Sequence, residues 1–270
     1  MRGDIAIVRS GGDIASGVIQ KLHRSGFRVL ILETENPTSI RRTVCFSEAV
    51  FNGKMEIEGI TSVLVKSEEE ILKSWEKDLV PLIVDANGKY IDIIKPIAVI
   101  DAILAKKNLG MKKNLAPITI GIGPGFEANK DVHIVIESNR GHNLGKLIFE
   151  GSAENNTGMP GNIAGFTVER VLYSPCDGIF TSNHEIGEVV KKGDIVAVVN
   201  GVNIYSKIDG LIRGIIRNGT YVTDGFKVGD IDPRVEQIKN CYTISDKACS
   251  IGGAVLEALM IGKLNCKKIL

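Results

Sequence analysis

Hydrophobic residues near the start of the chain form short continuous runs separated by a segment with helical spacing. Ile5 to Val8 is one such run, and apolar residues then recur at positions 14, 18, 19 and 22. Arg28 to Leu32 is a second run, which ends at the acidic Glu33. This order predicts a strand, a turn, an amphipathic helix and a second strand.

The same alternation continues beyond Glu33. We expect strands over 61–65, 82–85, 117–122 and 132–137, an acidic helix over 67–77, and a helix from Pro96 to Ala105 that begins with proline. Alternating strands and helices are typical of a mainly parallel sheet. The sequence therefore predicts a Rossmann-like α/β domain over residues 1–165.

The stretch from Ser174 to Pro233 has another pattern, because the same phrase occurs in it twice. Asp177-Gly178 recurs as Asp209-Gly210, Gly187 as Gly219, Val190 as Val222, Gly193 as Gly225 and Val196 as Val228, each at an offset of 32 positions. The short Val/Ile-rich runs between these turns have no helical periodicity. The repeat predicts two halves that interlock into a small all-β domain.

This repeat resembles the biotinyl/lipoyl-carrier fold, the barrel-sandwich hybrid, in which the hairpin between the halves presents a lysine that receives biotin or lipoate. Here the junction from Val198 to Ile204 contains Asn200-Gly201, a signal for a type I′ hairpin, and no lysine. We therefore expect a barrel-sandwich hybrid module over residues 166–234 with a structural or docking role and no biotin or lipoate attached. A true carrier is the alternative that the repeat alone suggests.

After the repeat, apolar residues from Ala248 to Leu259 form one stripe and predict a helix. Gly252 and Gly253 lie inside it, and each costs about 1 kcal/mol relative to alanine. Close contact with another backbone is the expected compensation. Residues 235–270 are thus predicted to be a C-terminal helical segment that packs on the main domain.

Composition narrows the classes of function. The 270 residues carry a net charge of +1, and 44% are hydrophobic, so a core can form while nucleic-acid binding lacks its main electrostatic support. Five cysteines lie far apart without a CxxC pair, which indicates a reducing compartment and no structural metal site. No apolar run approaches the roughly 20 residues of a membrane span. We expect a cytoplasmic protein that binds neither nucleic acid nor membrane.

Ser10, Gly11, Gly12 and Asp13 join the first strand to the first helix, where a dinucleotide-binding fold has its glycine-rich turn. The backbone N–H groups of such a turn can approach a phosphate, and Glu33 could bond ribose hydroxyls. Serine in place of the first glycine and the negative charge of Asp13 both oppose this interpretation. A tight turn that only packs the helix on the sheet is the alternative.

Other candidate ligand contacts lie near strand ends or in loops. Ligands of parallel sheets bind beyond the carboxyl ends of the strands, so Asp85 and the Ser10 turn are expected near a common edge. Arg42 could meet an anion there, although paired arginines are more often surface ion-pair partners. Arg140 and His142 place a permanent cation and a titratable ring in one loop, which suits an anionic or phosphorylated ligand. The alternative is a loop rich in Asn and Gly for backbone reasons alone.

Several segments together resemble the YqeB-type family of accessory proteins for selenium-dependent molybdenum hydroxylases. They are Arg9–Gly17, Arg41–Val44, Gly121–Phe126, Glu137–His142, Gly229–Arg234, Thr243–Ala248 and Gly252–Ala258. The resemblance implies a role in preparing or inserting a labile selenium-containing molybdenum centre into an enzyme similar to xanthine or purine dehydrogenase. It also implies a Rossmann-like N-terminal domain, and it supplies no catalytic residues.

Two functions follow as expectations. The first is an accessory protein that binds a molybdopterin-type cofactor, NAD(P) or another nucleotide at the sheet edge and docks the client hydroxylase. The alternative is an NAD(P)-dependent enzyme that acts on a small molecule or a cofactor precursor, suggested by the strand–turn–helix and Glu33. We expect the accessory role over a classical enzyme, and the sequence leaves open whether the chain forms a homo-oligomer.

Overall fold

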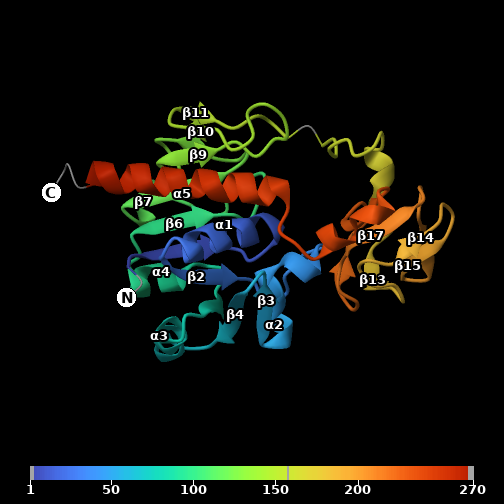
Figure 1. Ribbon diagram of the computed structural model, residues 1–270, viewed down its shortest axis with the longest axis horizontal. Coiled ribbons are helices and arrows are strands. Elements are labelled where there is room, and N and C mark those ends of the chain that lie inside the picture. The colour runs from blue at the N-terminus through green and yellow to red at the C-terminus, as the bar shows by residue number, and fades with distance from the viewer. Residues whose placement is uncertain (1–2, 157, 267–270) are drawn as a thin grey trace. The chain divides into compact units, whose positions relative to one another are not determined.

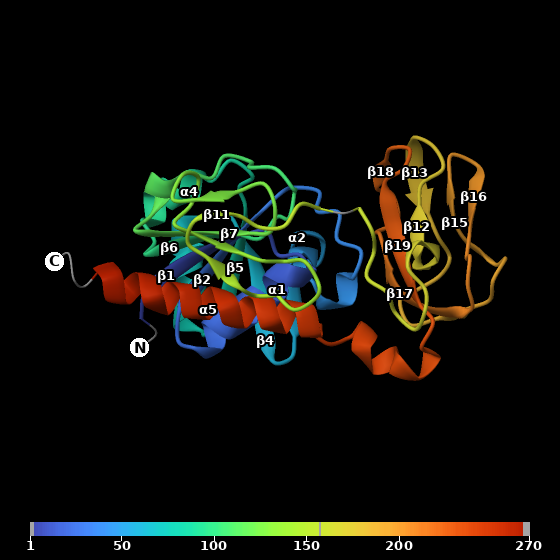
Figure 2. The same ribbon diagram turned by 90° about the horizontal axis from the view of Figure 1, so that it is seen from above.

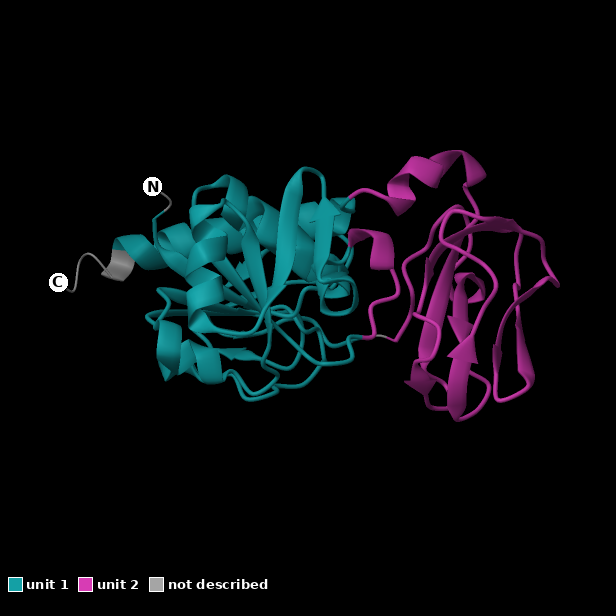
Figure 3. Ribbon diagram, turned by 90° about the horizontal axis from the view of Figure 1, so that it is seen from below, with its two compact units in different colours: residues 1–37, 45–156, 244–270 teal, residues 38–44, 157–243 magenta. Residues whose placement is uncertain are grey.

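The structure is a computed structural model that describes residues 3–156 and 158–266, and it divides into two compact units (Figure 3). Unit 1 comprises residues 1–37, 45–156 and 244–270, and unit 2 comprises residues 38–44 and 157–243. The chain enters unit 2 for a short segment at 38–44 before it returns to unit 1. The divisions predicted at 165/166 and 234/235 both lie inside unit 2.

A nine-stranded sheet runs through unit 1 in the order β10-β9-β7-β6-β1-β2-β5-β4-β3 (Figure 1). The strands are β1 Ile5–Arg9, β2 Arg28–Glu33, β3 Lys54–Ile57, β4 Ile60–Val65, β5 Val80–Val84, β6 Ala98–Asp101, β7 Ile118–Ile122, β9 Ile134–Ile136 and β10 Leu147–Ile148. Strands from β9 to β4 pair in parallel, whereas β10 and β3 at the two edges are antiparallel to their neighbours. A separate antiparallel ribbon pairs β8 Glu127–Ala128 with β11 Gly151–Ser152.

Helices pack on both faces of this sheet. They are α1 Asp13–Arg24, α2 Ala49–Asn52, α3 Glu68–Glu76, α4 Lys89–Ile94 and α5 Asp246–Cys266, with 3-10 turns η2 Phe46–Glu48 and η3 Lys113–Leu115. The helices α1 and α5 lie side by side (Figures 1 and 2) and bury Val18, Leu22, Val255 and Leu259 in one core with the sheet. Trp75 of α3 belongs to a second core, which includes the opposite, alternate positions of the strands.

Two glycines let α1 and α5 approach closely. A Cβ at Gly252 would lie 2.5 Å from the carbonyl oxygen of Gly17, and a Cβ at Gly17 would collide with the backbone of Ala248. The expected backbone contact is therefore confirmed at Gly252. Gly253 is different, because it is exposed and nothing lies within 4 Å of its Cβ position.

The helix predicted from Pro96 to Ala105 is wrong. Ala98–Asp101 forms β6, which pairs in parallel with β1 and β7 in the interior of the sheet. All four of its residues are buried, so the strand has no alternation of polar and apolar positions. A short apolar run of this kind cannot be distinguished from a buried helix by periodicity alone.

The predicted fold class, a Rossmann-like domain joined to a barrel-sandwich hybrid module, is also wrong. The structure is a mixed α/β fold with several sheets, and antiparallel strands occupy both edges of the main sheet. The β3–β4 hairpin precedes β5 in sequence, yet β5 lies between β2 and β4 in the sheet. Periodicity locates strands but does not fix their spatial order, because pairing depends on long-range contacts.

Unit 2 contains two four-stranded antiparallel sheets, β12-β19-β17-β14 and β16-β15-β13-β18. The elements are η1 Arg42–Val44, η4 Val168–Arg170, β12 Val171–Tyr173, β13 Gly178–Thr181, β14 Val189–Val190, β15 Ile195–Val199, β16 Val202–Tyr205, β17 Gly210–Ile215, β18 Tyr221–Val222, β19 Lys227–Asp232 and η5 Val235–Cys241. Strands β14 and β18 occupy equivalent repeat positions, and each pairs with a strand of the other half. The 32-residue repeat in the sequence thus corresponds to a repeat of strands.

The hairpin between β15 and β16 has the predicted type I′ geometry. Val199 pairs with Val202, and the two residues between them, Asn200 and Gly201, have φ values of 47° and 81°. A two-residue turn with positive φ at both central positions matches the twist of the strands that flank it. The Asn-Gly signal in the sequence is therefore confirmed.

Candidate functional site

The turn between β1 and α1 is held by local hydrogen bonds. The N–H of Gly12 donates to Ser10 Oγ at 3.1 Å, and the N–H of Gly11 donates to Glu33 Oε2 at 2.8 Å. Ser10 has a φ of 87°, a left-handed conformation that costs a non-glycine residue about 1 kcal/mol. Asp13 lies in the first turn of α1, where a carboxylate interacts favourably with the helix dipole.

Glu33 is 7% exposed, and both of its carboxylate oxygens accept hydrogen bonds. Oε2 accepts the N–H of Gly11, and Oε1 accepts the N–H of Thr34 at 2.8 Å. Burial raises the pKa of Glu33, while the bonds from Gly11 and Thr34 oppose that rise. Glu33 therefore ties the end of β2 to the β1–α1 turn, and its oxygens are committed to backbone donors instead of ribose hydroxyls.

Residues 46 and 47 cover the same turn. The N–H of Ser47 donates to the carbonyl oxygen of Gly11 at 2.9 Å, and a Cβ at Gly11 would lie only 2.7 Å from that nitrogen. Ser16 Oγ accepts the N–H of Phe46 at 3.2 Å. A pyrophosphate needs space beside the turn and free N–H donors. The residues present do not fit a dinucleotide held in the way the sequence suggested.

A buried ion pair lies at the carboxyl ends of β1 and β6, and the sequence reasoning did not identify it. Arg9 Nη1 is 2.8 Å from Asp101 Oδ2, and the two residues are 7% and 2% exposed. Arg9 Nη2 donates to the carbonyl of Leu109 at 2.8 Å, and Asp101 Oδ1 accepts the N–H of Ile103 at 3.1 Å. Burial raises the pKa of Asp101, and Arg9 opposes the rise. Opposite charges at the ends of adjacent strands are a usable signal, but the helix predicted from Pro96 to Ala105 includes Asp101, which in fact ends β6.

Two predicted site residues lie in different units. Asp85 follows β5, and its N–H donates to the carbonyl oxygen of Glu33 at 2.9 Å, while its Oδ2 accepts the N–H of Tyr90 at 2.8 Å. Arg42 belongs to unit 2, where its Nε donates to the carbonyl of Ile215 at 2.9 Å. Asp85 is therefore bonded to the last residue of β2 in unit 1. Arg42 is bonded to a backbone carbonyl of unit 2.

The 139–145 loop contacts the first turns of α5. Arg140 donates two hydrogen bonds to the carboxylate of Asp246, at 2.7 Å and 2.9 Å. A Cβ at Gly145 would lie 3.0 Å from Ser250 Oγ. His142 is exposed and forms no hydrogen bond with any residue in the described ranges. Arg140 therefore docks the loop on the helix, and His142 is the member of the predicted pair whose ring remains open to a ligand.

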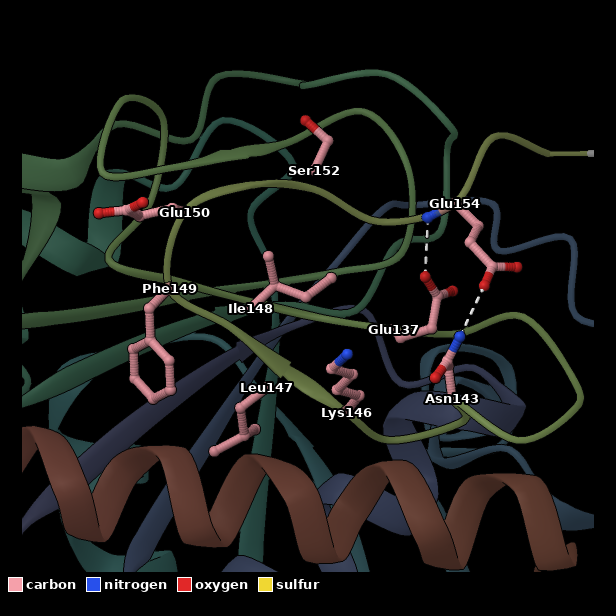
Figure 4. A pocket seen from close by; sticks show the side chains of 9 residues that line it. All are labelled: Glu137, Asn143, Lys146, Leu147, Ile148, Phe149, Glu150, Ser152 and Glu154. Atoms are coloured by element: carbon pink, nitrogen blue, oxygen red, sulfur yellow. Dashed lines mark hydrogen bonds between the residues drawn. The ribbon is translucent and has the colours of Figure 1, made fainter.

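Two carboxylates hold the 139–145 loop at both of its ends. Glu137 is 2% exposed; its Oε1 accepts the N–H of Asn139 at 2.6 Å, and its Oε2 accepts the N–H of Glu154 at 2.7 Å. The carboxylate of Glu154 accepts a hydrogen bond from the side-chain amide of Asn139 at 2.7 Å. It accepts a second from the side-chain amide of Asn143 at 3.0 Å (Figure 4). These amide donors lower the pKa of Glu154. The loop is therefore braced independently of any ligand.

A groove of about 390 Å³ opens beside this loop (Figure 4). Its lining residues are Glu137, Asn143, Lys146, Leu147, Ile148, Phe149, Glu150, Ser152 and Glu154. Strand β10 at the sheet edge contributes the aliphatic part, and carboxylate, amide and ammonium groups contribute the polar part. A volume of this size is in the range of small-molecule sites, which combine apolar walls with a few polar groups.

The charge of Lys247, the second residue of α5, is influenced by charged groups from four segments, and the sequence analysis did not select this residue. Burial is the main cause that lowers the pKa of Lys247, and Arg140 adds to it, whereas Asp13, Glu137 and Asp246 oppose it. These groups come from the start of α1, the residue after β9, the 139–145 loop and the start of α5. The polar run Ser245-Asp246-Lys247 before an apolar helix was the available signal.

Two kinds of site have no support in the part of the chain that the structure describes. No three side chains of His, Cys, Asp or Glu within residues 3–156 and 158–266 come together as a metal site. Over the same ranges, no helix combines the length and the apolar character that crossing a membrane requires.

Comparisons with known proteins give one strong sequence relative. No protein-family profile matches the chain. The chain is 49% identical over 257 residues to "Uncharacterized protein YqeB" from Escherichia coli strain K12. The aligned residues make up 95% of this chain and 47% of YqeB. The chain thus spans about half the length of the curated relative that it matches.

Solved structures to which the chain is similar include proteins of the succinylglutamate desuccinylase/aspartoacylase type. One is an aspartoacylase family protein from Mesorhizobium loti, which is 12% identical with a TM-score of 0.24. The matched region covers 79% of this chain and 59% of that protein. Another is a succinylglutamate desuccinylase from Silicibacter, 12% identical with a TM-score of 0.25 over 85% and 84% of the two chains. Scores this low carry no argument about activity. The sequence match alone places the chain: over nearly all of its length it is a homologue of YqeB.

Proposed function

We propose that this chain is an accessory protein in the maturation of a selenium-dependent molybdenum hydroxylase. In this role it binds an anionic cofactor or cofactor precursor in unit 1 and docks a client enzyme of the xanthine or purine dehydrogenase type. The homology to YqeB supports this proposal, together with the family resemblance of the motifs at Arg9–Gly17 and Glu137–His142. Because the chain spans about half of YqeB, the proposal concerns the part of that protein that it matches.

The observation that carries the proposal is the braced loop beside the groove of about 390 Å³. Glu137 and Glu154 fix the 139–145 loop through hydrogen bonds of 2.6–3.0 Å. A loop held in this way can receive a ligand without first being ordered, so binding costs less conformational entropy. Such pre-organisation suits a protein that holds a labile compound for transfer.

A molybdopterin-type cofactor is the proposed ligand, and its phosphate is the group that these residues can recognise. His142 and Lys146 would contact such an anion from the loop and the groove, since both are exposed cationic or titratable groups in unit 1. An NAD(P)-dependent enzyme remains the second proposal, but it is weaker. Glu33 carries the carboxylate that would bind the ribose hydroxyls, and this carboxylate accepts hydrogen bonds from the N–H groups of Gly11 and Thr34.

The test is to isolate the client hydroxylase from cells with and without this protein. Molybdenum and selenium per hydroxylase subunit are measured by elemental mass spectrometry, alongside hydroxylase activity. We expect the deletion strain to produce hydroxylase at normal abundance with substoichiometric selenium or molybdenum, and re-expression of the full chain to restore both. Full metal and selenium content with full activity in the deletion strain would refute the proposal.

A further inference from the structure

One face of the β16-β15-β13-β18 sheet in unit 2 is formed by apolar and neutral residues from all four strands. Tyr221 pairs with Ile179, Thr181 pairs with Val198, Val198 pairs with Asn203, and Ile195 pairs with Tyr205. Directly paired residues, and residues two positions apart on one strand, point to the same side of a sheet. These seven residues therefore share one side of the sheet, and we call them the apolar face.

The large side chains of the apolar face are open to solvent. Their exposed fractions are 50% for Ile179, 47% for Ile195, 50% for Tyr205 and 63% for Tyr221. The alternate positions of the same strands, such as Phe180 and Val199, are buried in the core of unit 2. Side chains of these sizes together expose on the order of 500 Å² of mostly apolar surface. This area is in the range of the largest patch on a typical monomer, and such patches often mark interaction sites.

The 32-residue repeat supplies an internal comparison for this face. The positions equivalent to Ile195, Val198 and Thr181 in the other sheet hold the charged residues Lys227, Asp230 and Arg213. The chain itself covers that sheet at Asp230, because a Cβ on its pairing partner Gly214 would lie 2.8 Å from Ile40 Cγ2. Within residues 3–156 and 158–266, one half of the repeat thus has a charged, covered face, and the other half has an apolar, open one.

We infer that the apolar face is the interface of a homodimer, in which it packs against the same face of a second copy of this chain. In a two-fold symmetric contact each patch meets its own copy, so a charged patch would bring like charges together. The apolar face has no charged residue and avoids this repulsion. Homodimer interfaces are also more apolar than those of non-obligate complexes, which favours a second copy over the client enzyme.

The face is large enough for a dimer, and its polar side chains are already bonded. A specific interface of standard size buries about 800 Å² per partner, of which the apolar side chains provide about 500 Å² and a polar rim provides the remainder. Asn203 Nδ2 donates to the hydroxyl of Tyr205 at 3.1 Å, and Thr181 Oγ1 donates to the carbonyl of Val198 at 3.3 Å. These internal bonds reduce the cost of burying polar groups. The inference goes beyond the proposed function, because the ligand groove lies in unit 1.

The experiment is sedimentation equilibrium of the full chain at about 1 to 100 µM, a range in which a micromolar dissociation constant is measured directly. The wild type should form dimers. Ile195→Lys introduces the charge that the other sheet carries at Lys227, so two unpaired ammonium groups would enter each interface. This variant should dimerise about a hundredfold more weakly, and Tyr205→Glu should do the same through two carboxylates.

Tyr173→Glu is the matched control. Tyr173 occupies the repeat position equivalent to Tyr205 and lies opposite Lys227 in the other sheet, so this variant should dimerise as the wild type does. The three replaced side chains are exposed, and circular dichroism should show that each variant is folded. A monomeric wild type overturns the inference, as do dimers that Ile195→Lys and Tyr205→Glu leave intact. A monomeric wild type that binds the client hydroxylase through this face also overturns it and assigns the face to the client.

Hydrogen exchange of the wild-type chain tests the same face without a substitution. Exchange is followed by peptide mass spectrometry at a concentration that gives dimers and again after dilution to monomers. Peptides from β13, β15, β16 and β18 should exchange more slowly in the dimer, whereas those from β12, β14, β17 and β19 should be unchanged. Equal protection of both sheets contradicts the inference. It would leave the maturation role standing, since that role is measured by the selenium and molybdenum content of the client.

Discussion

Substitution of Glu33 can distinguish a structural role of its carboxylate from a ribose-binding role. Replacing it with alanine removes two acceptors, for the N–H of Gly11 and the N–H of Thr34, each at 2.8 Å. Bonds to a charged group contribute about 1.5–3 kcal/mol each, and Gly11 is buried, so its N–H cannot recover a water molecule. Thr34 is exposed and regains hydration. We therefore expect Glu33→Ala to lower the free energy of unfolding by about 2–4 kcal/mol.

Urea denaturation followed by circular dichroism measures this loss, with Glu69→Gln as the control. Glu69 is an exposed carboxylate paired with Lys73 on α3, and its neutralisation should change stability by less than about 0.5 kcal/mol. A Glu33→Ala protein as stable as the wild type, with weakened NAD(P) binding, would refute the structural interpretation of Glu33 and favour the dinucleotide enzyme.

The pH dependence of stability gives the same carboxylate a second signature. Burial raises the pKa of Glu33 above its ordinary value of 4.5, so the native state binds this proton more tightly than the unfolded state. The resulting stabilisation is complete below about pH 4.5 and is lost as the pH rises through the raised pKa. The stability of wild type relative to Glu33→Gln should therefore decline over that window, whereas parallel profiles would contradict the assignment.

Four further substitutions test the packing of the two units by urea denaturation. Gly252→Ala should destabilise the protein by about 2 kcal/mol, because the new Cβ would collide with the backbone of α1. Gly253→Ala should stabilise it by about 0.5–1 kcal/mol, because the Cβ there would lie in open space. Equal effects of the two substitutions would contradict the described contact between the helices. In unit 2, the buried guanidinium of Arg170 lies 2.7 Å from the carboxylate of Asp230. Asp230→Asn removes this counter-charge and should lower the free energy of unfolding by about 3–5 kcal/mol. A decrease of less than about 1 kcal/mol would show that the pair is hydrated. Gly201→Val should cost about 1–2 kcal/mol, since a β-branched residue resists the positive φ of the hairpin, and an unchanged midpoint would argue against the type I′ turn.

Local signals in the sequence identified local structure well. The Asn200-Gly201 turn depends on two adjacent residues, and the repeat with an offset of 32 depends on direct comparison of the sequence with itself, so both were accessible without coordinates. The contact at Gly252 was also accessible, because a glycine in a helix implies a neighbour that needs the space. The buried β6 strand was not, since four buried residues in a row carry no period.

The candidate site shows the same limit for side chains. The sequence placed Glu33 beside the glycine turn, but it could not reveal that backbone N–H groups occupy both oxygens. Likewise, Arg140 was selected for its charge, yet its partner Asp246 is more than a hundred positions away.

Native mass spectrometry of the freshly isolated full chain tests most directly whether this protein holds an anionic ligand in the groove beside the 139–145 loop. Wild-type and Lys146→Gln proteins are purified in parallel, and the small molecules that they retain are released and identified. A pterin-type or other phosphorylated compound on the wild type, reduced about tenfold on the variant, is the expected result. A nicotinamide dinucleotide retained equally by both proteins would contradict the account.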